Sequence, residues 1–293
     1  MSIKQYGCLH HVVHMQFDLA LPSAMFLIVT ASVLLYRKTE RTFSTLLGDQ
    51  KFSIRDAVIM VVVMGLMIST IAFLPGQTIQ IGFMAAYSYM LFMFTYMVLK
   101  KMYLAIVPPI VFLLSYIYFF SHLAVFNLFV VIFAIIITVY ISTFFTWKTV
   151  WLFAAILTIM DIIQVYITGF MKQAAIGMID LKLPVMLIIP RFPPGNLVDL
   201  GTGDLFLAGL LAIQTAKKLG QKTGILVAAM NGVAMFIFEV ISFNTRFADF
   251  FPATVVVVAG WLASLATFHL MNPKRKKQGI EIVVVEDYLK YQA

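Results

Sequence analysis

The chain has 293 residues, of which 62% are hydrophobic and only 12% are charged. A soluble domain is about half apolar and about a quarter charged, so this composition excludes a soluble globular protein. It predicts an all-α polytopic membrane protein, because a helix that spans a bilayer satisfies its own backbone hydrogen bonds. The formal net charge of +8 then indicates basic loops that set orientation, and we expect no nucleic-acid partner.

Nine apolar segments are predicted to be membrane helices, for which about 20 residues are needed. They lie at roughly 17–36, 55–74, 79–99, 102–120, 124–146, 149–171, 201–216, 223–243 and 251–271. The fourth carries Pro108-Pro109, so we expect it to kink or to begin there. The seventh is short for a span. The first follows a leader without a basic start, so it is predicted to be retained rather than cleaved as a signal peptide.

The connector at 172–200 is the only long one between the predicted helices. It contains an apolar run from Leu183 to Ile189 that is too short to cross a membrane. We expect this run to form either a strand or a re-entrant segment.

Lysine and arginine are concentrated on one side of this nine-helix arrangement. That side holds Arg37, Lys38, Arg41, Lys51, Arg55, Lys100, Lys101, Lys148, Lys217, Lys218, Lys222, Lys274, Arg275, Lys276 and Lys277. The other side holds only Lys4, Lys172, Lys182, Arg191 and Arg246. The positive-inside rule therefore predicts an outside N-terminus and a cytoplasmic C-terminus, in the cell membrane if the organism is a prokaryote. An even number of spans would break this alternation.

Two carboxylates fall inside predicted membrane helices, where each costs about 2.5–3.5 kcal/mol at the centre of a span. Asp161 lies in the middle of the sixth helix, and Asp204 begins the short seventh helix. Because helices joined by a connector are antiparallel neighbours in most bundles, we expect the two side chains to face a shared interface. Two close carboxylates share a proton, so one can act as a base on water while the other polarises a carbonyl.

Simpler interpretations of both residues stay open. Asp161 on its own fits a packing hydrogen bond or a conduction pathway, and Asp204 fits an N-cap at a helix start. Gly201 and Gly203 remove side chains just before Asp204, which lets another backbone approach closely.

The ninth helix opens with Pro252-Ala253-Thr254. Proline in a first helical turn is a routine start signal. The functional interpretation is a helix break whose free backbone groups face a cavity or hold an extended peptide.

Together these elements resemble the presenilin and signal peptide peptidase family of GxGD intramembrane aspartyl proteases. The matching residues are Asp161, Gly201-Thr202-Gly203-Asp204 and Pro252-Ala253-Thr254, on the sixth, seventh and ninth predicted helices. Two positions depart from the family pattern, because Met160 replaces a tyrosine and Thr254 replaces a leucine. The likeness covers about residues 148–260, and the expected orientation resembles the signal peptide peptidase branch, since presenilins run the opposite way.

The resemblance implies hydrolysis of peptide bonds within transmembrane segments of membrane-protein or signal-peptide substrates. It implies Asp161 and Asp204 as the catalytic pair and no metal or other cofactor. The substrate-binding residues it implies are Gly201, Gly203, Pro252, Ala253 and Thr254. It divides the chain into scaffold helices at 1–147, a catalytic core at 148–273 and a cytoplasmic tail at 274–293.

Other assignments compete with this one. A proton- or cation-coupled transporter or channel would also use buried aspartates, although we find no repeat of the sixth and seventh helices in the first half of the chain. Prepilin peptidases also carry a GxGD aspartate, and their partner aspartate lies in an early helix, where the candidate here is Asp18.

Further polar residues receive plain interpretations. Cys8, His10, His11 and His14 lack a metal-ligand spacing, so a polar leader is favoured over a metal site. An ion pair or hydrogen bond of Glu239 near Arg246 is favoured over a proton relay, and Asn231 is expected to link helices.

Overall fold

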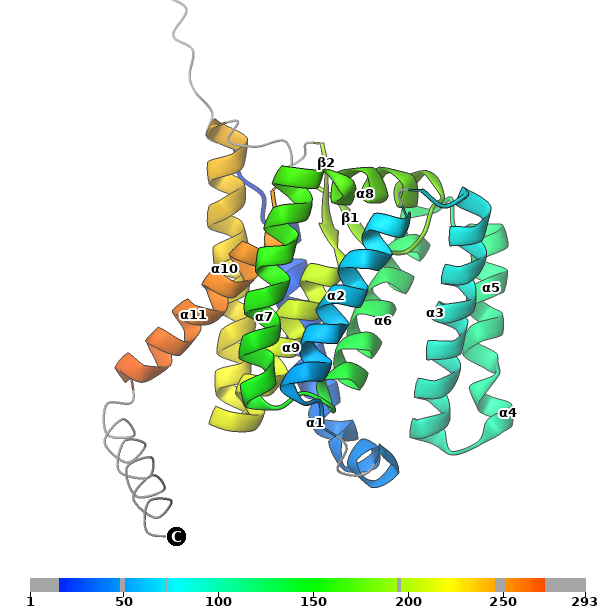
Figure 1. Ribbon diagram of the computed structural model, residues 1–293, viewed down its shortest axis with the longest axis horizontal. Helices are drawn as coiled ribbons and strands as arrows, with labels where there is room; N and C mark the ends of the chain where they lie inside the picture. Colours follow the sequence, from blue (N-terminus) through cyan, green and yellow to red (C-terminus); the bar gives the residue numbers. More distant parts are fainter. Residues whose placement is uncertain (1–15, 48–50, 72, 194–195, 246–250, 272–293) are drawn as a thin grey trace, which may run out of the picture.

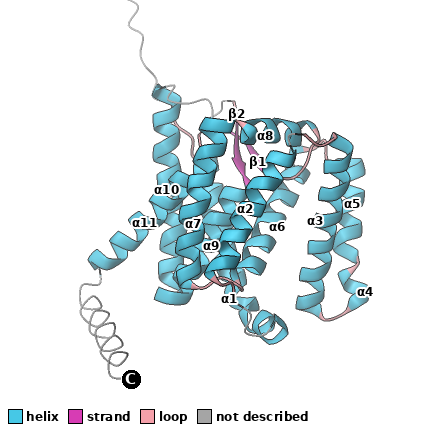
Figure 2. Ribbon diagram, viewed as in Figure 1, coloured by secondary structure: helices cyan, strands magenta, loops and turns pink. Residues whose placement is uncertain are grey.

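The computed structural model describes residues 16–47, 51–71, 73–193, 196–245 and 251–271. These residues form a helical bundle with one small two-stranded sheet (Figures 1 and 2). Eight helical segments are long and apolar enough to cross a membrane: Ala20–Glu40, Ile54–Ile71, Gly76–Leu99, Met102–Phe119, Leu123–Ser142, Trp147–Thr168, Gln221–Thr245 and Ala253–Met271. The chain is therefore an all-α polytopic membrane protein, as its composition predicts.

The helices are α1 (Ala20–Leu47), α2 (Ile54–Ile71), α3 (Gly76–Leu99), α4 (Met102–Ala105), α5 (Val107–Phe119), α6 (Leu123–Ser142), α7 (Trp147–Ile162), the π-helix η1 (Ile163–Thr168), α8 (Phe170–Asp180), α9 (Thr202–Leu219), α10 (Gln221–Thr245) and α11 (Ala253–Met271). The strands are β1 (Met186–Pro190) and β2 (Leu197–Gly201). Every predicted membrane helix has a counterpart, with its ends shifted by a few residues. The first is the exception, because α1 continues well past its predicted end.

Helix α9, which corresponds to the seventh predicted helix, is not among the eight candidate spans. It carries three charged residues, namely Asp204 at its start and Lys217 and Lys218 at its end. It is nevertheless the central helix of the bundle, with 13 of its 18 residues buried. It packs against α1, α6, α7, α10 and α11.

Small residues allow these close contacts around α9. A Cβ added to Gly209 would lie 2.5 Å from a methyl group of Thr138 on α6. One added to Gly224 on α10 would lie 2.9 Å from the backbone oxygen of Ala212. Such close approach increases van der Waals contact between the helices, and this contact stabilises their association in a bilayer, where the hydrophobic effect between helices is absent.

The predicted fourth helix is divided where the proline pair predicts a break. Helix α4 ends at Ala105, and α5 begins at Val107 with Pro108 and Pro109 in its first turn. Proline lacks a backbone N–H, which is no loss in a first turn because those groups have no partner inside the helix.

The connector at 172–200 contains more structure than the sequence pattern predicts. Helix α8 occupies its first part and was not expected. The apolar run from Leu183 forms strand β1, which confirms the strand interpretation and not the re-entrant one. Strand β2, which was also not expected, pairs with β1 in antiparallel register and leads directly into α9.

Helices α3, α5 and α6 meet through aromatic rings at the side of the bundle. The rings of Tyr87 and Phe112 meet at a tilt with centroids 4.2 Å apart, and the Tyr87 hydroxyl donates to the backbone oxygen of Phe129 at 2.6 Å. Only three residues of α3 and one of α5 are buried. These two helices thus form a peripheral lobe with most of its surface outward (Figure 1).

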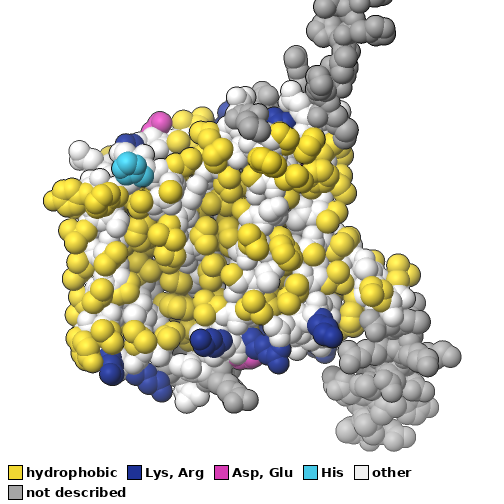
Figure 3. Space-filling view, turned by 180° about the vertical axis from the view of Figure 1, so that it is seen from behind, with side chains coloured by type: hydrophobic (Ala, Val, Ile, Leu, Met, Phe, Trp, Pro, Cys, Tyr) yellow, Lys and Arg dark blue, Asp and Glu magenta, His cyan; other side chains and the backbone are white. Residues whose placement is uncertain are grey.

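Basic side chains gather at one end of the bundle. Most of the Lys and Arg side chains in view follow one edge of the molecule, and the flank between the two edges is mostly hydrophobic (Figure 3). The basic end comprises the C-terminal ends of α1, α3 and α9 and the beginnings of α2, α7 and α10, while the β1–β2 hairpin lies at the other end. This distribution matches a hydrocarbon layer between two aqueous faces.

Candidate functional site

Asp161 lies at the end of α7, far inside the bundle. The helix begins with a capping box in which the side chains of Thr146 and Thr149 bond each other's backbone N–H groups. Asp161 follows fifteen residues after that cap and is only 4% exposed. The π-helix η1 starts two residues later, and such segments are frequent at functional sites.

Residues next to Asp161 hold α7 against α2. The amide of Gln164 donates to the backbone oxygen of Gly65 at 3.0 Å. The sulfur of Met160 lies 2.5 Å from the position of a Cβ added to Gly65. Met160 therefore fills a contact between α7 and α2.

The beginning of α11 contacts Asp161 directly. The hydroxyl of Thr254 donates to Oδ2 of Asp161 at 2.6 Å, and both side chains are buried. Thr254 is the second residue of α11, and Pro252 immediately precedes the helix. The structure thus brings the predicted ninth-helix motif to the sixth-helix aspartate.

Asp204 lies in the first turn of α9 and is 7% exposed. It interacts electrostatically with Asp161, so the two predicted carboxyls belong to one site. Helix α7 packs on α9, and α11 packs on both. The site is therefore built where three helices meet, two of which present their N-terminal turns.

The two glycines before Asp204 have different surroundings. A Cβ at Gly201 would lie 3.0 Å from Oδ2 of Asp204, so a side chain there would press on the carboxyl. A Cβ at Gly203 would meet no atom within 4 Å. A side chain at Gly201 would therefore displace the Asp204 carboxyl by a few tenths of an ångström, whereas Gly203 borders open space.

Neither the N-cap interpretation of Asp204 nor the assignment of Asp18 as its partner matches the structure. Gly201 occupies the N-cap position of α9, and Asp204 follows three residues later, so the N-cap interpretation of Asp204 is wrong. Asp18 uses its two oxygens to accept backbone N–H groups of Ala20, Leu21 and Phe192. Asp18 therefore fixes the start of α1 and the loop after β1, and does not pair with Asp204 as a prepilin-type site requires.

Asn127 of α6 occupies the outer edge of β1. Its amide donates to the backbone oxygen of Ile188 at 2.6 Å and accepts from the backbone N–H of Ile188 at 3.0 Å. Both backbone groups of Ile188 therefore point away from β2. A further strand cannot bind at this position of β1 without displacing Asn127.

The register then defines the free edge of the sheet. In an antiparallel pair, opposite residues alternate between those that bond each other and those that point their groups outward. Ile188 pairs with Asp199, so Asp199 also directs its N–H and C=O outward, on the edge of β2 away from β1. The backbone N–H of Thr202 donates to Val185 at 2.9 Å, which continues the same alternation up to the start of α9.

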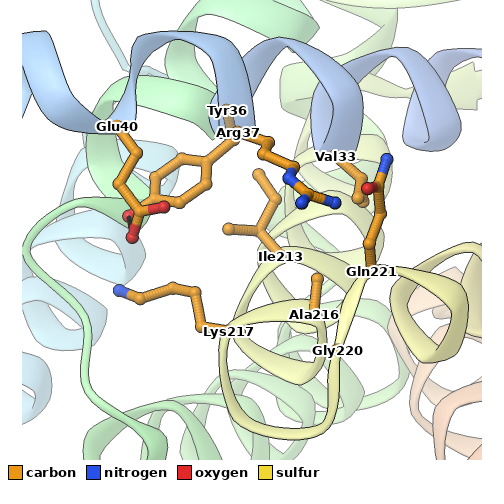
Figure 4. Close-up of a pocket in the computed structure, with 9 residues that line it drawn as sticks. All are labelled: Val33, Tyr36, Arg37, Glu40, Ile213, Ala216, Lys217, Gly220 and Gln221. Atoms are coloured by element: carbon orange, nitrogen blue, oxygen red, sulfur yellow. Dashed lines mark hydrogen bonds between the residues drawn. The ribbon is translucent and has the colours of Figure 1, made fainter.

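A pocket of about 400 Å³ lies at the basic end of the bundle, about 20 Å along α9 from Asp204 at 1.5 Å per residue. Helix α1 and the end of α9 form its walls, with Arg37 and Glu40 on one side and Lys217 facing Glu40 from the other (Figure 4). It contains neither aspartate of the candidate site. Its polar lining fits an aqueous interface rather than a cavity for the predicted chemistry.

The remaining predicted residues have mixed outcomes. Glu239 of α10 is buried and interacts with the charges of Asp18 and Arg191. Its expected neighbour Arg246 lies outside the described residues, as do Cys8 and the three histidines of the leader. Asn231 packs against Gly260 of α11, but its amide atoms have no hydrogen-bond partner among the described residues, so the expected polar link between helices is not seen there.

Comparison with known proteins adds no assignment. No family model matches the chain, and no curated protein matches it. The resemblance to the GxGD proteases therefore rests on the sequence motifs and on the arrangement of α7, α9 and α11.

Sequence reasoning missed two residues of this region, Asn127 and Gln164. Each is a lone amide in an apolar helix, and such residues in a membrane segment indicate an interhelical partner. That signal identifies the residue but not the partner, which lies 61 residues away for Asn127 and 99 for Gln164.

Proposed function

We propose that the chain is an intramembrane aspartyl protease of the presenilin and signal peptide peptidase type. The observation that carries this proposal is the pair of buried carboxyls, Asp161 and Asp204, on two packed helices and close enough for their charges to interact. A carboxyl pair of this kind holds one proton between two groups, which provides both a base and an acid.

The reaction is a direct addition of water to the scissile peptide. One aspartate removes a proton from water as the water oxygen bonds to the carbonyl carbon, and the other gives its proton to the carbonyl oxygen. The tetrahedral diol then collapses: one diol hydroxyl returns its proton to the aspartate that protonated the carbonyl, the C–N bond breaks, and the leaving nitrogen takes the proton that the other aspartate removed from water. A carboxylic acid and an amine result, and the pair again shares one proton.

The substrate in this proposal is a transmembrane helix that unwinds next to the site. An extended peptide in a membrane needs partners for its amide groups. The outward N–H and C=O of Asp199 on β2 supply such partners five residues before Asp204, and β1 is closed at Asn127. We therefore assign strand addition by the substrate to β2 rather than to β1. Gly203, beside open space, lets the substrate backbone approach the pair.

The proposal includes nine spans, namely the eight candidate spans and helix α9, which is the seventh in chain order. Helix α9 runs from the hairpin end to the basic end, and its charges lie only at its termini. The basic end is assigned to the cytoplasm by the positive-inside rule, so the N-terminus is outside and the C-terminus is cytoplasmic. Epitope tags at residue 293 and between α9 and α10 should react only after permeabilisation of intact cells. A C-terminal tag exposed in intact cells would contradict this orientation.

Cleavage of a reporter protein with one transmembrane helix tests the activity. The purified wild type should cleave it, and Asp161→Asn and Asp204→Asn should each lose activity by several orders of magnitude. The double variant should be no worse than either, because a proton-sharing pair acts as a unit. Glu239→Gln is the matched control, since it also neutralises a buried carboxyl in a membrane helix and should retain cleavage.

The same variants distinguish a transporter. A proton- or cation-coupled carrier would change flux into liposomes on loss of either aspartate, while the wild type would not cleave. Wild-type protein that folds but shows no proteolysis, or a strongly active Asp204→Asn variant, would overturn the proposed function.

A further inference from the structure

The hydrogen bond between Thr254 and Asp161 makes the two carboxyls unequal. Asp161 Oδ2 accepts the Thr254 hydroxyl at 2.6 Å. The backbone N–H of Thr254 faces the same carboxyl. Within the described residues, Asp204 receives no hydrogen bond from another side chain.

Each carboxyl faces the N-terminal turn of a helix: Asp161 faces that of α11, and Asp204 lies in that of α9, where its own backbone N–H faces its carboxyl. The first N–H groups of a helix have no partner inside it and carry partial positive charge. Thr254 is the second residue of this 19-residue helix, so its N–H is one of these groups. The Thr254 hydroxyl is therefore the contact that distinguishes the two, and a hydroxyl that donates to a carboxyl stabilises its charged form.

The packing leaves Thr254 little freedom to serve another partner. Its side chain is 5% exposed, and it lies in the first turn of α11, a helix that packs on both α7 and α9. A threonine hydroxyl has one proton to donate, and here that proton is directed at Asp161.

We propose that Thr254 is a positioning residue that holds Asp161 as the ionised base and leaves the shared proton on Asp204. The inference rests on the proposed function, and it changes the role that the family resemblance implies for this position from substrate contact to control of the dyad. Asp161 then removes the proton from water, and Asp204 protonates the scissile carbonyl. The leucine usual at this position offers no hydroxyl, so this control is a property of the present chain.

A carbodiimide measures the inequality without any catalytic turnover. The reagent adds to a protonated carboxylic acid, whose O–H proton moves to a carbodiimide nitrogen while its oxygen bonds to the central carbon. In wild-type protein it should label Asp204 in preference to Asp161. In Thr254→Val, which keeps the shape and loses the hydroxyl, the ratio of Asp161 to Asp204 labelling should rise about tenfold, the effect of one hydrogen bond to a charged group.

Kinetics on the reporter substrate give the second readout. Thr254→Val and Thr254→Ala should lower kcat about tenfold with KM unchanged, because the lost interaction acts on the base and not on the substrate. Thr254→Ser keeps the hydroxyl and should retain wild-type kcat and the wild-type labelling ratio. Thr254→Leu, which installs the usual family residue, should behave as Thr254→Val does. Thermal unfolding of each variant identifies any that fails to fold, and the Ala variant then replaces the Val variant.

Two results would overturn the inference while leaving the protease assignment intact. One is a labelling ratio that stays unchanged in both hydroxyl-free variants. The other is a change confined to KM or to the cleavage position, with Thr254→Leu as active as the wild type, which is what a substrate-contact role predicts. Absence of cleavage by folded wild-type protein overturns the proposed function and this inference with it.

Discussion

The core around α9 and the lobe formed by α3 and α5 use different residues to pack their helices together. In the core, backbones approach one another at glycines, and most of α9 is buried. In the lobe, large rings fill the space between helices that remain mostly exposed. Neither region gains from removing apolar surface from water while both lie in lipid, so van der Waals contact and hydrogen bonds must hold each together.

The difference has a functional meaning. Close backbone approach at a glycine fixes the relative positions of two helices, as Gly224 does for α10 and α9, the helix that carries Asp204. Helix α7, which carries Asp161, meets Gly65 of α2 through the side chain of Met160. Ring contacts tolerate small shifts, because an aromatic pair is favourable over a range of centroid separations. The core should therefore be sensitive to a single added methyl group, and the lobe should not.

The largest effect is expected at Gly260 of α11. A Cβ there would lie 2.4 Å from Asn231 Oδ1, 3.0 Å from Asn231 Cα and 3.1 Å from the backbone oxygen of Met230. Because two of these atoms belong to the backbone, Gly260→Ala should lower the free energy of unfolding by about 1–3 kcal/mol, the usual cost of overpacking. It should also reduce cleavage, since α11 carries Thr254.

Gly82→Ala in α3 is the matched control. A Cβ at Gly82 meets no atom within 4 Å. The substitution should leave stability unchanged or raise it by up to about 1 kcal/mol through helix propensity. Thermal unfolding in detergent measures both variants, and equal losses would show that the two regions do not differ in packing.

The second effect concerns Asn127, which links α6 to the hairpin. Asn127→Leu removes two hydrogen bonds and leaves both backbone groups of Ile188 without this partner. At about 0.6–1.7 kcal/mol for each polar contact in a membrane, the stability loss should be about 1–3 kcal/mol. Cleavage should fall about tenfold, because misplacement of a positioning segment commonly costs that much or more.

Gln80→Leu provides the corresponding change in the lobe. It removes the hydrogen bond that the side-chain amide of Gln80 donates to the hydroxyl of Tyr116 at 2.6 Å. Like Asn127→Leu, this variant should lower the free energy of unfolding, but cleavage per folded molecule should be unchanged. A loss of activity equal to that of Asn127→Leu would place the lobe in the catalytic machinery and end the distinction between the two regions.

Particular elements explain what the sequence could predict. The proline pair locates the break before α5 because proline geometry is a local property. The Gly201–Asp204 and Pro252–Thr254 segments predicted that α9 and α11 contribute to one candidate site, and the structure brings the starts of both helices next to α7. The central position of α9 was not predictable, because its charged ends lower its apparent hydrophobicity, and burial depends on five neighbouring helices.

The sequence pattern also could not predict which side chains distant in sequence bond to one another. Thr254 appeared as a departure from the family residue, but its hydrogen bond to Asp161 joins positions 93 residues apart. Strand β2 was missed because Asp199 interrupts its short apolar run, and its pairing depends on the turn that returns the chain to β1.

A smaller effect is expected at Tyr87 in the lobe. Tyr87→Phe keeps every ring contact and removes only the hydroxyl that donates to Phe129 at 2.6 Å. The free energy of unfolding should fall by about 0.5–1.5 kcal/mol, and cleavage should be unchanged. Tyr89→Phe, at an exposed position of the same helix, should change neither. A large activity loss in Tyr87→Phe would contradict the assignment of the lobe to scaffold alone.

The smallest effect concerns Asp199, whose backbone lies on the free edge of β2. Partial burial raises the pKa of its carboxyl above the ordinary value. The charged form is thus penalised in the folded state, so Asp199→Asn should raise the melting temperature at neutral pH. The gain should shrink as the pH falls through the raised pKa and vanish below about 3.9, where the unfolded carboxyl is also protonated. Because Asp199 remains partly exposed, solvent screening limits the gain to a fraction of a kcal/mol. Asp180→Asn at the end of α8 controls for the loss of one negative charge. A gain that grows on acidification would reverse the sign and refute the assigned cause.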